Sequence, residues 1–367
     1  NLNLNSKDPF DIWLLNLTYK LQLDIMDTFY KLELFRVPNI IFKFIDSLTN
    51  IWVKFSRDRL KNNYVITDTI NSLSTLFRVL TLTNTVISPM IPFNTDFLYN
   101  YLNYHFKNSK YYSIHTMFTN PNVTYDSNII DSVENLYNII EIIRSSRKEI
   151  KEKFDRPLNS PIRNMEVYLP SIYQNKINKE FDKFIIEQCN IENLQYFFDK
   201  VESIITPNKG AIGKKFKKEG KNVIKLINDS KVDDLLQGKV IYRSVVITNE
   251  FFNITSQKIE KENYYSVQSG IYLILLDVTL DDELIWKTKL ALWKREIQEL
   301  RKQLNFKFWD KIDLLVDRST VSEDFNQQWI NHFENLINAK VKLTENLNDP
   351  YQFNYDSDNI KYSIELL

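Results

Sequence analysis

Hydrophobic and polar positions follow a helical period through the first third of the chain, most clearly between residues 38 and 61. At 100° per residue this segment is a helix with two faces. Its apolar face comprises Ile41, Phe44, Ile45, Leu48, Ile51, Trp52 and Phe55. Its polar and basic face comprises Lys43, Asn50, Lys54, Arg57 and Lys61. Such a helix either packs on a bundle and exposes a solvated charged side, which is the commoner case, or offers that side to a polyanion.

The same period predicts further helices on both sides of this segment. Asp8 and Pro9 form a cap followed by a first-turn proline, so a helix is expected to begin there. The other expected helices begin at residue 67 or span residues 93–106 and 129–153. Because the connections between them are short, the pattern predicts an antiparallel helical bundle. Two prolines at positions 157 and 161 end the last helix and mark a domain border near residue 160.

Beyond that border, patterns typical of strands and helices alternate. Strands are expected over residues 165–169, 194–198, 240–248, 271–277 and 312–316. Helices are expected over residues 176–188, 211–228, 283–304 and 325–338. The alternation predicts small α+β layers rather than one doubly wound sheet. We therefore expect three domains, at residues 1–160, 161–270 and 271–367, with a polar, loosely held tail after Leu343.

The 367 residues carry 47 basic and 47 acidic side chains, so a polyanion site can come only from local clustering. The densest basic cluster contains Glu219 as its single acid and comprises Lys209, Lys214, Lys215, Lys217, Lys218, Lys221 and Lys225. It could hold several phosphates, or it could be the solvated side of an amphipathic helix, and the sequence leaves both interpretations open. Lys153 and Arg156 belong to a second basic stretch, which neighbouring acids partly neutralise.

Arg59 falls toward the apolar face of the helix predicted over residues 38–61. Three explanations are open: the helix frays before Arg59, its guanidinium is paired with an acid, or it points at an RNA base. Trp52 lies in the middle of the apolar face, so we expect it in the core rather than as a platform for bases.

Other chemistries find little support in the sequence. The single cysteine, Cys189, excludes an internal disulfide framework and is expected to be a buried small hydrophobe. The three histidines lack the spacing of a metal site, and the five glycines form no phosphate-binding loop. We find no catalytic constellation, and no apolar run is long enough to span a bilayer. Since the first residue is not Met, we expect a piece of a longer protein.

Several stretches carry family-like motifs. Residues 46–61 place a tryptophan before an R-x-R-L-type segment, residues 87–99 read I-S-P-M-I-P-F-N-T-D-F-L-Y, and residues 113–115 read S-I-H. Residues 272–279 read Y-L-I-L-L-D-V-T, and residues 295–302 read R-E-I-Q-E-L-R-K. Together, and in this order, they resemble the C-terminal half of isoleucyl-tRNA synthetase, a class I synthetase, especially in its eukaryotic cytosolic form. Residues 286–292, W-K-T-K-L-A-L, depart from the acidic residue, glycine and A-R-E usual in that family.

The resemblance implies a mainly α anticodon-binding bundle followed by smaller α+β subdomains, which together grip the anticodon stem and loop of isoleucine tRNA. It implies that ATP and magnesium, and the aminoacylation and editing sites, belong to a separate N-terminal half of a cytoplasmic enzyme. This portion would then hold no cofactor, metal or catalytic residue and would be inactive alone. The expected partners are the tRNA and that N-terminal half, with no membrane.

The residues expected to contact tRNA are Lys43, Asn50, Lys54, Arg57, Arg59, Lys61, Lys153, Arg156, Lys209, Lys214, Lys215, Lys217 and Lys218. The alternative is a helical scaffold whose amphipathic helices dock other proteins without direct RNA recognition. A charge reversal at Lys54 and Arg57 separates these two functions, because only RNA binding depends on the basic face.

Overall fold

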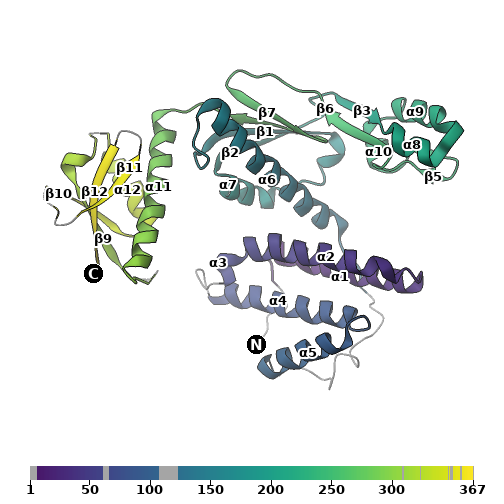
Figure 1. The fold of residues 1–367 in the computed structure, drawn as a ribbon, viewed down its shortest axis with the longest axis horizontal. Helices are drawn as coiled ribbons and strands as arrows, with labels where there is room; N and C mark the ends of the chain where they lie inside the picture. Colours follow the sequence, from purple (N-terminus) through teal and green to yellow (C-terminus); the bar gives the residue numbers. More distant parts are fainter. Residues whose placement is uncertain are drawn as a thin grey trace.

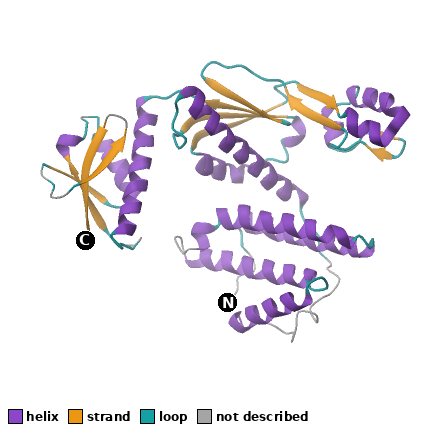
Figure 2. Cartoon of the chain, viewed as in Figure 1, coloured by secondary structure: helices purple, strands orange, loops and turns teal. Residues whose placement is uncertain are grey.

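The computed structural model describes residues 6–60, 66–106, 123–307, 310–322, 324–345, 347, 350–355 and 358–366. The N-terminal part of the chain is built from helices (Figure 1, Figure 2). They are α1 (Pro9–Tyr30), α2 (Val37–Ser47), α3 (Arg57–Leu60), α4 (Ile66–Ile87), α5 (Pro92–Phe106) and α6 (Ser127–Phe154). Because α1 packs against α2, α4 and α6, the predicted helical bundle is confirmed. The S-I-H stretch lies outside the described residues.

Helix α1 begins where the sequence predicts. The Asp8 carboxylate accepts hydrogen bonds from the backbone N–H groups of Phe10 and Asp11, at 2.9 and 3.3 Å, and Pro9 occupies the first turn. These contacts satisfy two of the N–H groups that a helix start leaves unpaired. The inward side of α1 is buried and includes Trp13, Leu14, Leu21 and Ile25.

The segment expected to be one helix over residues 38–61 is a helical run with an irregular centre. Helix α2 passes into a π-helical turn (Leu48–Val53), and after an irregular residue, Ser56, the short α3 completes the run. Lys61 lies outside the described residues. Ile45 is exposed, but the rest of the predicted apolar face is wholly or partly covered, and its buried members are Phe44, Leu48, Ile51 and Trp52. The apolar backing is therefore confirmed, although a π turn interrupts the regular α-helical period.

Helix α6 leads into a four-stranded sheet with the order β2-β1-β8-β7. Strand β1 (Ile162–Leu169) runs parallel to β2 (Ile191–Phe198), and α7 (Asp182–Cys189) lies between them in the chain. Strands β8 (Tyr272–Asp277) and β7 (Tyr264–Ser269) add antiparallel neighbours. Buried side chains of the bundle and of this sheet form one cluster, so the border near residue 160 does not separate two cores. The border expected at residue 270 divides neighbouring strands of one sheet.

A small lobe extends from this sheet at the right of Figure 1. Its base is the antiparallel pair β3 (Ser203–Pro207) and β6 (Phe252–Ser256). The lobe also contains α8 (Lys209–Phe216), α9 (Gly220–Asn228), α10 (Val232–Leu236), β4 (Ile241–Tyr242) and β5 (Val245–Val246). We call residues 203–256 the lysine lobe. It has its own hydrophobic cluster, which includes Ile212, Val223, Ile227 and Phe251.

Two predictions in the lysine lobe are wrong in detail. The helix expected over residues 211–228 is divided into α8 and α9, because Lys217 takes a positive φ of 47° that an α-helix cannot continue. The strand expected over residues 240–248 is a hairpin whose turn contains Arg243 and Ser244, both with positive φ. Both breaks fold the segment back on itself, which allows its apolar residues to meet in one small core.

The C-terminal unit contains α11 (Asp282–Gln303), β9 (Ile312–Asp317), α12 (Gln327–Ile337), β10 (Lys340–Thr344), β11 (Tyr351–Tyr355) and β12 (Asp358–Leu366). Its sheet has the order β10-β9-β12-β11, with the buried Trp293 of α11 in the core. The prediction of a loose tail after Leu343 is wrong. Strand β12 lies between β9 and β11 and buries Ile360 and Tyr362. The second half of the chain thus consists of small α+β layers, as expected.

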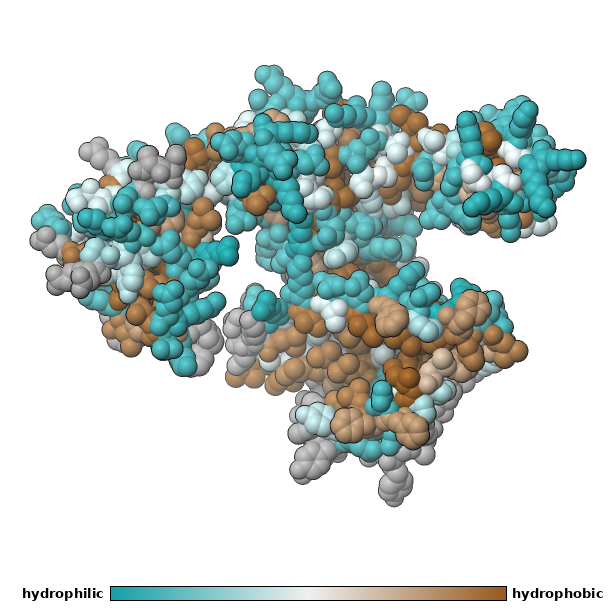
Figure 3. Space-filling view, viewed as in Figure 1, coloured by the Kyte–Doolittle hydropathy of each residue, from teal (hydrophilic) through white to brown (hydrophobic). Residues whose placement is uncertain are grey.

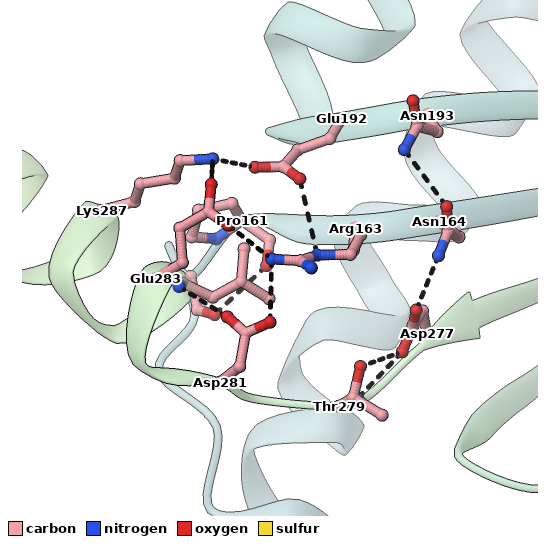
Figure 4. Close-up of polar contacts among 12 residues, drawn as sticks. Pro161, Arg163, Asn164, Glu192, Asn193, Asp277, Thr279, Asp281, Glu283 and Lys287 are labelled. Carbon is pink, nitrogen blue, oxygen red and sulfur yellow. Dashed lines mark hydrogen bonds and ion pairs between the residues drawn. The ribbon is translucent and has the colours of Figure 1, made fainter.

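A charged network holds the start of α11 against the first sheet (Figure 4). Arg163 of β1 contacts Asp281 at 2.8 Å and Glu283 at 3.0 Å. Lys287, one turn further along α11, pairs with Glu283 at 2.7 Å and with Glu192 of β2. Asp281 caps α11 by accepting from the backbone N–H of Leu284, and Asp281 and Glu283 together join α11 to the first sheet. None of the described helices is both long and apolar enough to cross a membrane.

Candidate nucleic-acid interface

The basic side of the α2–α3 run faces solvent. Lys43, Asn50, Lys54 and Arg57 are all exposed, and we call these four residues the bundle face. Asn50 donates its side-chain amide to Asp46, while Lys43, Lys54 and Arg57 form no ion pair within the part of the chain that the structure describes. An anionic ligand could therefore approach these three cations without first displacing an acidic partner.

Lys54 is partly buried and is influenced by the charges of α6. Partial burial lowers the pKa of Lys54, and repulsion from Arg144 of α6 lowers it further, with Glu141 acting in the opposite direction. Arg144 itself contacts Glu141 at 3.0 Å and donates to Gln188 at 3.1 Å. A phosphate beside Lys54 would offset the repulsion between Lys54 and Arg144, because its negative charge would balance the positive charge of the Lys54 ammonium.

Arg59 is a correction to the predicted interface, because its side chain is only 10% exposed. Its guanidinium lies 2.8 Å from Asp11, 2.9 Å from Asp68 and 3.2 Å from Asp8. Burial alone would lower the pKa of Arg59, but hydrogen bonds to Asp11 and Asp68 outweigh burial and raise it. Asp11 also accepts from the Trp52 indole at 3.0 Å. Of the three explanations, pairing with acids holds, and Arg59 ties α3 to α1 and α4.

The two basic residues near the end of α6 differ in role. Lys153 is exposed, lies 3.7 Å from Glu149 and places its ammonium over the Tyr265 ring. Arg156 is buried and donates to the carbonyls of Asp277 and Thr279, both at 2.9 Å. Burial lowers the pKa of Arg156, with Asp277 opposing the shift. Arg156 is therefore the second correction: it joins the end of α6 to the end of β8 and leaves no donor group at the surface for RNA.

The lysine lobe carries the densest exposed positive charge of the described residues. All seven of its clustered lysines are exposed and none has an acidic partner within 4 Å in the described structure; they are Lys209, Lys214, Lys215, Lys217, Lys218, Lys221 and Lys225. The only acid in that stretch, Glu219, is occupied by Arg243 and by the Tyr242 hydroxyl. Ile212, Val223 and Ile227 point into the lobe core. The helices are thus amphipathic, and their polar sides leave the lysine charge uncompensated.

Comparison with known proteins connects the bundle to a family. Residues 11–162 match the family model described as the anticodon-binding domain of tRNA ligase. The cytoplasmic isoleucine–tRNA ligase of Arabidopsis thaliana is 28% identical over 360 residues, covering 93% of this chain and 29% of the plant protein. The isoleucine–tRNA ligase of Treponema denticola is 25% identical, covering 86% of this chain and 29% of the bacterial one. The cytoplasmic isoleucine–tRNA ligase of Schizosaccharomyces pombe is 24% identical, covering 84% and 30%.

Most of the chain is thus similar to isoleucine–tRNA ligases, and its helical bundle is similar to their anticodon-binding domain. The resemblance read from the sequence is thereby confirmed. The chain spans about three tenths of the length of these ligases. The anticodon-binding domain accounts for the bundle and stops at residue 162, where β1 begins.

Relative to the segment that matches the anticodon-binding domain, the predicted interface residues fall into two groups. The bundle face and Lys153 lie inside the anticodon-binding domain, whereas the lysine lobe lies beyond it. Arg144 was not among the predicted contacts, although its charge lowers the pKa of Lys54. The sequence marks the end of α6 as basic, but residues 54 and 144 are 90 positions apart and nothing local joins them.

Proposed function

We propose that this chain is the tRNA-binding portion of an isoleucine–tRNA ligase and holds the anticodon arm of isoleucine tRNA. The observation that carries the proposal is the bundle face: exposed cations without acidic partners, inside the segment that matches the anticodon-binding domain. Lys43, Lys54 and Arg57 would contact phosphates. The Asn50 side-chain amide would release its hydrogen bond to Asp46 and form one with the edge of a base. The lysine lobe and Lys153 would extend the contact along the RNA backbone.

The test is a salt-dependent titration of the chain with isoleucine tRNA, comparing the wild type with K54E/R57E. Since each phosphate contact releases a counterion, losing two contacts should lower the slope of log K against log salt by about 2. We expect the affinity at about 0.1 M salt to fall at least ~10-fold. The matched control, K302E/K340E, makes the same charge change at exposed lysines of the C-terminal unit. Equal losses in both variants would attribute the effect to net charge alone.

A protein-docking scaffold remains the competing function, and the same variants distinguish it. If the basic side of α2–α3 were only solvated, K54E/R57E would bind tRNA like the wild type and any protein partner would still be retained. A flat salt response of the wild type would also argue for the scaffold, because phosphate recognition cannot be independent of salt.

For the longer protein we propose aminoacylation of isoleucine tRNA with ATP and magnesium in a separate catalytic half. The relatives' names support this assignment, and two of them are cytoplasmic enzymes, which supports a cytoplasmic location. Apolar residues exposed on the bundle support a further contact with that half. Figure 3 shows brown, hydrophobic surface over the helices of the bundle, where Leu32, Phe35, Phe93 and Phe97 are strongly exposed.

A further inference from the structure

The C-terminal unit contains a cleft that the proposed tRNA contacts do not use. It lies where α11, the start of α12 and the end of β11 meet, and it has a volume of about 650 Å³. This volume is within the range of protein sites that take a side chain or a small ligand. Its lining combines aromatic side chains, namely Trp286, Trp329 and Tyr355, with acidic ones, namely Asp282, Glu283 and Asp324.

The aromatic part of the cleft is held rigidly. Trp286 of α11 and Trp329 of α12 lie nearly parallel, with ring centroids 6.0 Å apart and 24° between the planes. Phe325, which is buried, stacks against Trp286 at 5.6 Å. A separation of 6.0 Å is too small to insert another ring between the two stacked indoles, so a partner can reach only their outer surface. Both indoles are half-buried, which leaves part of that surface open to a flat partner.

The charge of the cleft selects against anions. Lys289 is its only lining cation, and it is buried with its ammonium 4.2 Å from the Trp286 ring centroid. Glu283 is paired with Lys287 and Arg163, whereas Asp282 and Asp324 are exposed and form no ion pair with any described residue. A phosphate would meet these two carboxylates at close range. A cation would gain from them and from the open part of the Trp329 indole, since the Lys289 ammonium already lies over Trp286.

We propose that this cleft binds an arginine side chain presented by a partner protein. A guanidinium is flat, stacks on indole and donates a fork of N–H groups to carboxylates, and these properties match the aromatic surface and the two free acids. An ammonium would gain the charge but not the stacking, so arginine is preferred over lysine. The proposal is independent of tRNA binding, because none of the cleft residues belongs to the bundle face or to the lysine lobe.

The test uses the tripeptide acetyl-Gly-Arg-Gly-amide and ¹⁵N-indole NMR of the whole chain. The indole signals of Trp286 and Trp329, assigned with W286F and W329F, should shift on titration. The buried Trp13, Trp52 and Trp293 provide internal signals that should not move. The same peptide with citrulline, which keeps the shape of arginine but lacks its charge, should bind at least ~5-fold more weakly, as should D282N/D324N.

The matched control for D282N/D324N is D229N/E250Q, which removes two exposed acids of the lysine lobe and should leave peptide binding unchanged. The proposal is overturned if the arginine peptide moves neither cleft signal, or if the citrulline peptide binds equally well. It is also overturned if cytidine or a short single-stranded RNA moves the two signals at lower concentration than the arginine peptide. The cleft would then be a platform for bases, and the acidic rim would play no part in recognition.

Discussion

At the scale of the residue, Arg59 stabilises the bundle through a largely buried cluster of ion pairs. Its three carboxylate partners come from α1 and α4, and the Asp11 side chain is fully buried. Removing one member of a buried ion pair leaves the others uncompensated, which typically costs about 3–5 kcal/mol. We therefore expect R59A to unfold at a clearly lower denaturant concentration than the wild type, measured by circular dichroism without RNA.

The control for R59A is R36A, because Arg36 and Glu33 form an exposed pair one helical turn apart. Exposed pairs contribute about 0–1 kcal/mol, so R36A should unfold close to the wild type. If R59A and R36A unfold at the same denaturant concentration while R59A loses tRNA binding, then Arg59 contributes to RNA binding and not to the stability of the bundle.

Individual residues also show which features of the candidate site can be predicted from the sequence. The exposed cations Lys43, Lys54 and Arg57 follow from helical period alone, because exposure on one helix depends on local spacing. The period also places Arg59 toward the apolar face, but it cannot name the acceptors of Arg59 and Arg156, since Asp11 and Asp277 are 48 and 121 positions away. Arginine is equally suited to phosphates and to buried carboxylates or carbonyls, and only the folded chain decides between them.

At the scale of the element, the lysine lobe is a basic surface on a core of its own. Its lysines lie on two short helices, α8 and α9, and on the turn between them, and such exposed lysines suit contacts with phosphates, which carry no sequence information. We expect K214E/K215E/K217E/K218E to weaken binding of isoleucine tRNA and of a non-cognate tRNA by the same factor, at least ~10-fold, and to lower the salt slope. Filter binding with both tRNAs measures the ratio of the wild-type affinity to the variant affinity for each tRNA. An unchanged affinity and slope would mean that these lysines are only solvated.

The reversed side chains of that variant are exposed, so the lobe should remain folded. The comparison variant, K214Q/K215Q/K217Q/K218Q, removes the charge without reversing it and should give a smaller loss of affinity. Circular dichroism should show the same unfolding midpoint for both variants as for the wild type, since Ile212, Val223 and Ile227 remain in the core. If the loss of affinity were larger for isoleucine tRNA than for the non-cognate tRNA, the lobe would instead take part in sequence recognition.

The elements that the sequence missed are those whose pattern is short or mostly polar. Strand β12 alternates Ile360, Tyr362 and Ile364 with polar residues, which is the period of a half-buried strand, but its composition resembles a loose tail. Strands β3 and β6 of the lobe were missed for a related reason. Each has five residues, and each is stabilised by pairing with a strand that is about 50 positions away.

At the scale of the whole molecule, the bundle and the first sheet form one body. Helix α6, with 28 residues, contributes Ile139 and Ile143 to a cluster that also contains Met165 and Val167 of β1. Arg156 adds polar contacts at the same junction. RNA held on the bundle face would therefore be held in a fixed orientation relative to this sheet, because shared cores do not hinge freely.

The exposed apolar surface of the bundle bears on the longer protein proposed above. Phe93, Phe97 and Tyr101 recur every four residues along α5 and are 88%, 75% and 57% exposed. A stripe of this kind is unusual on a surface that stays in water, and it is the pattern by which a helix packs on a partner. We expect the catalytic half of the longer protein to cover it.

When the two halves are produced as separate chains, F93S/F97S should reduce their co-elution at least ~10-fold while leaving tRNA binding by this chain intact. The control, L304S/L343S, alters two exposed leucines of the C-terminal unit and should co-elute normally. If this chain alone sediments as a dimer that F93S/F97S dissociates, the stripe is a contact between two copies of this chain instead.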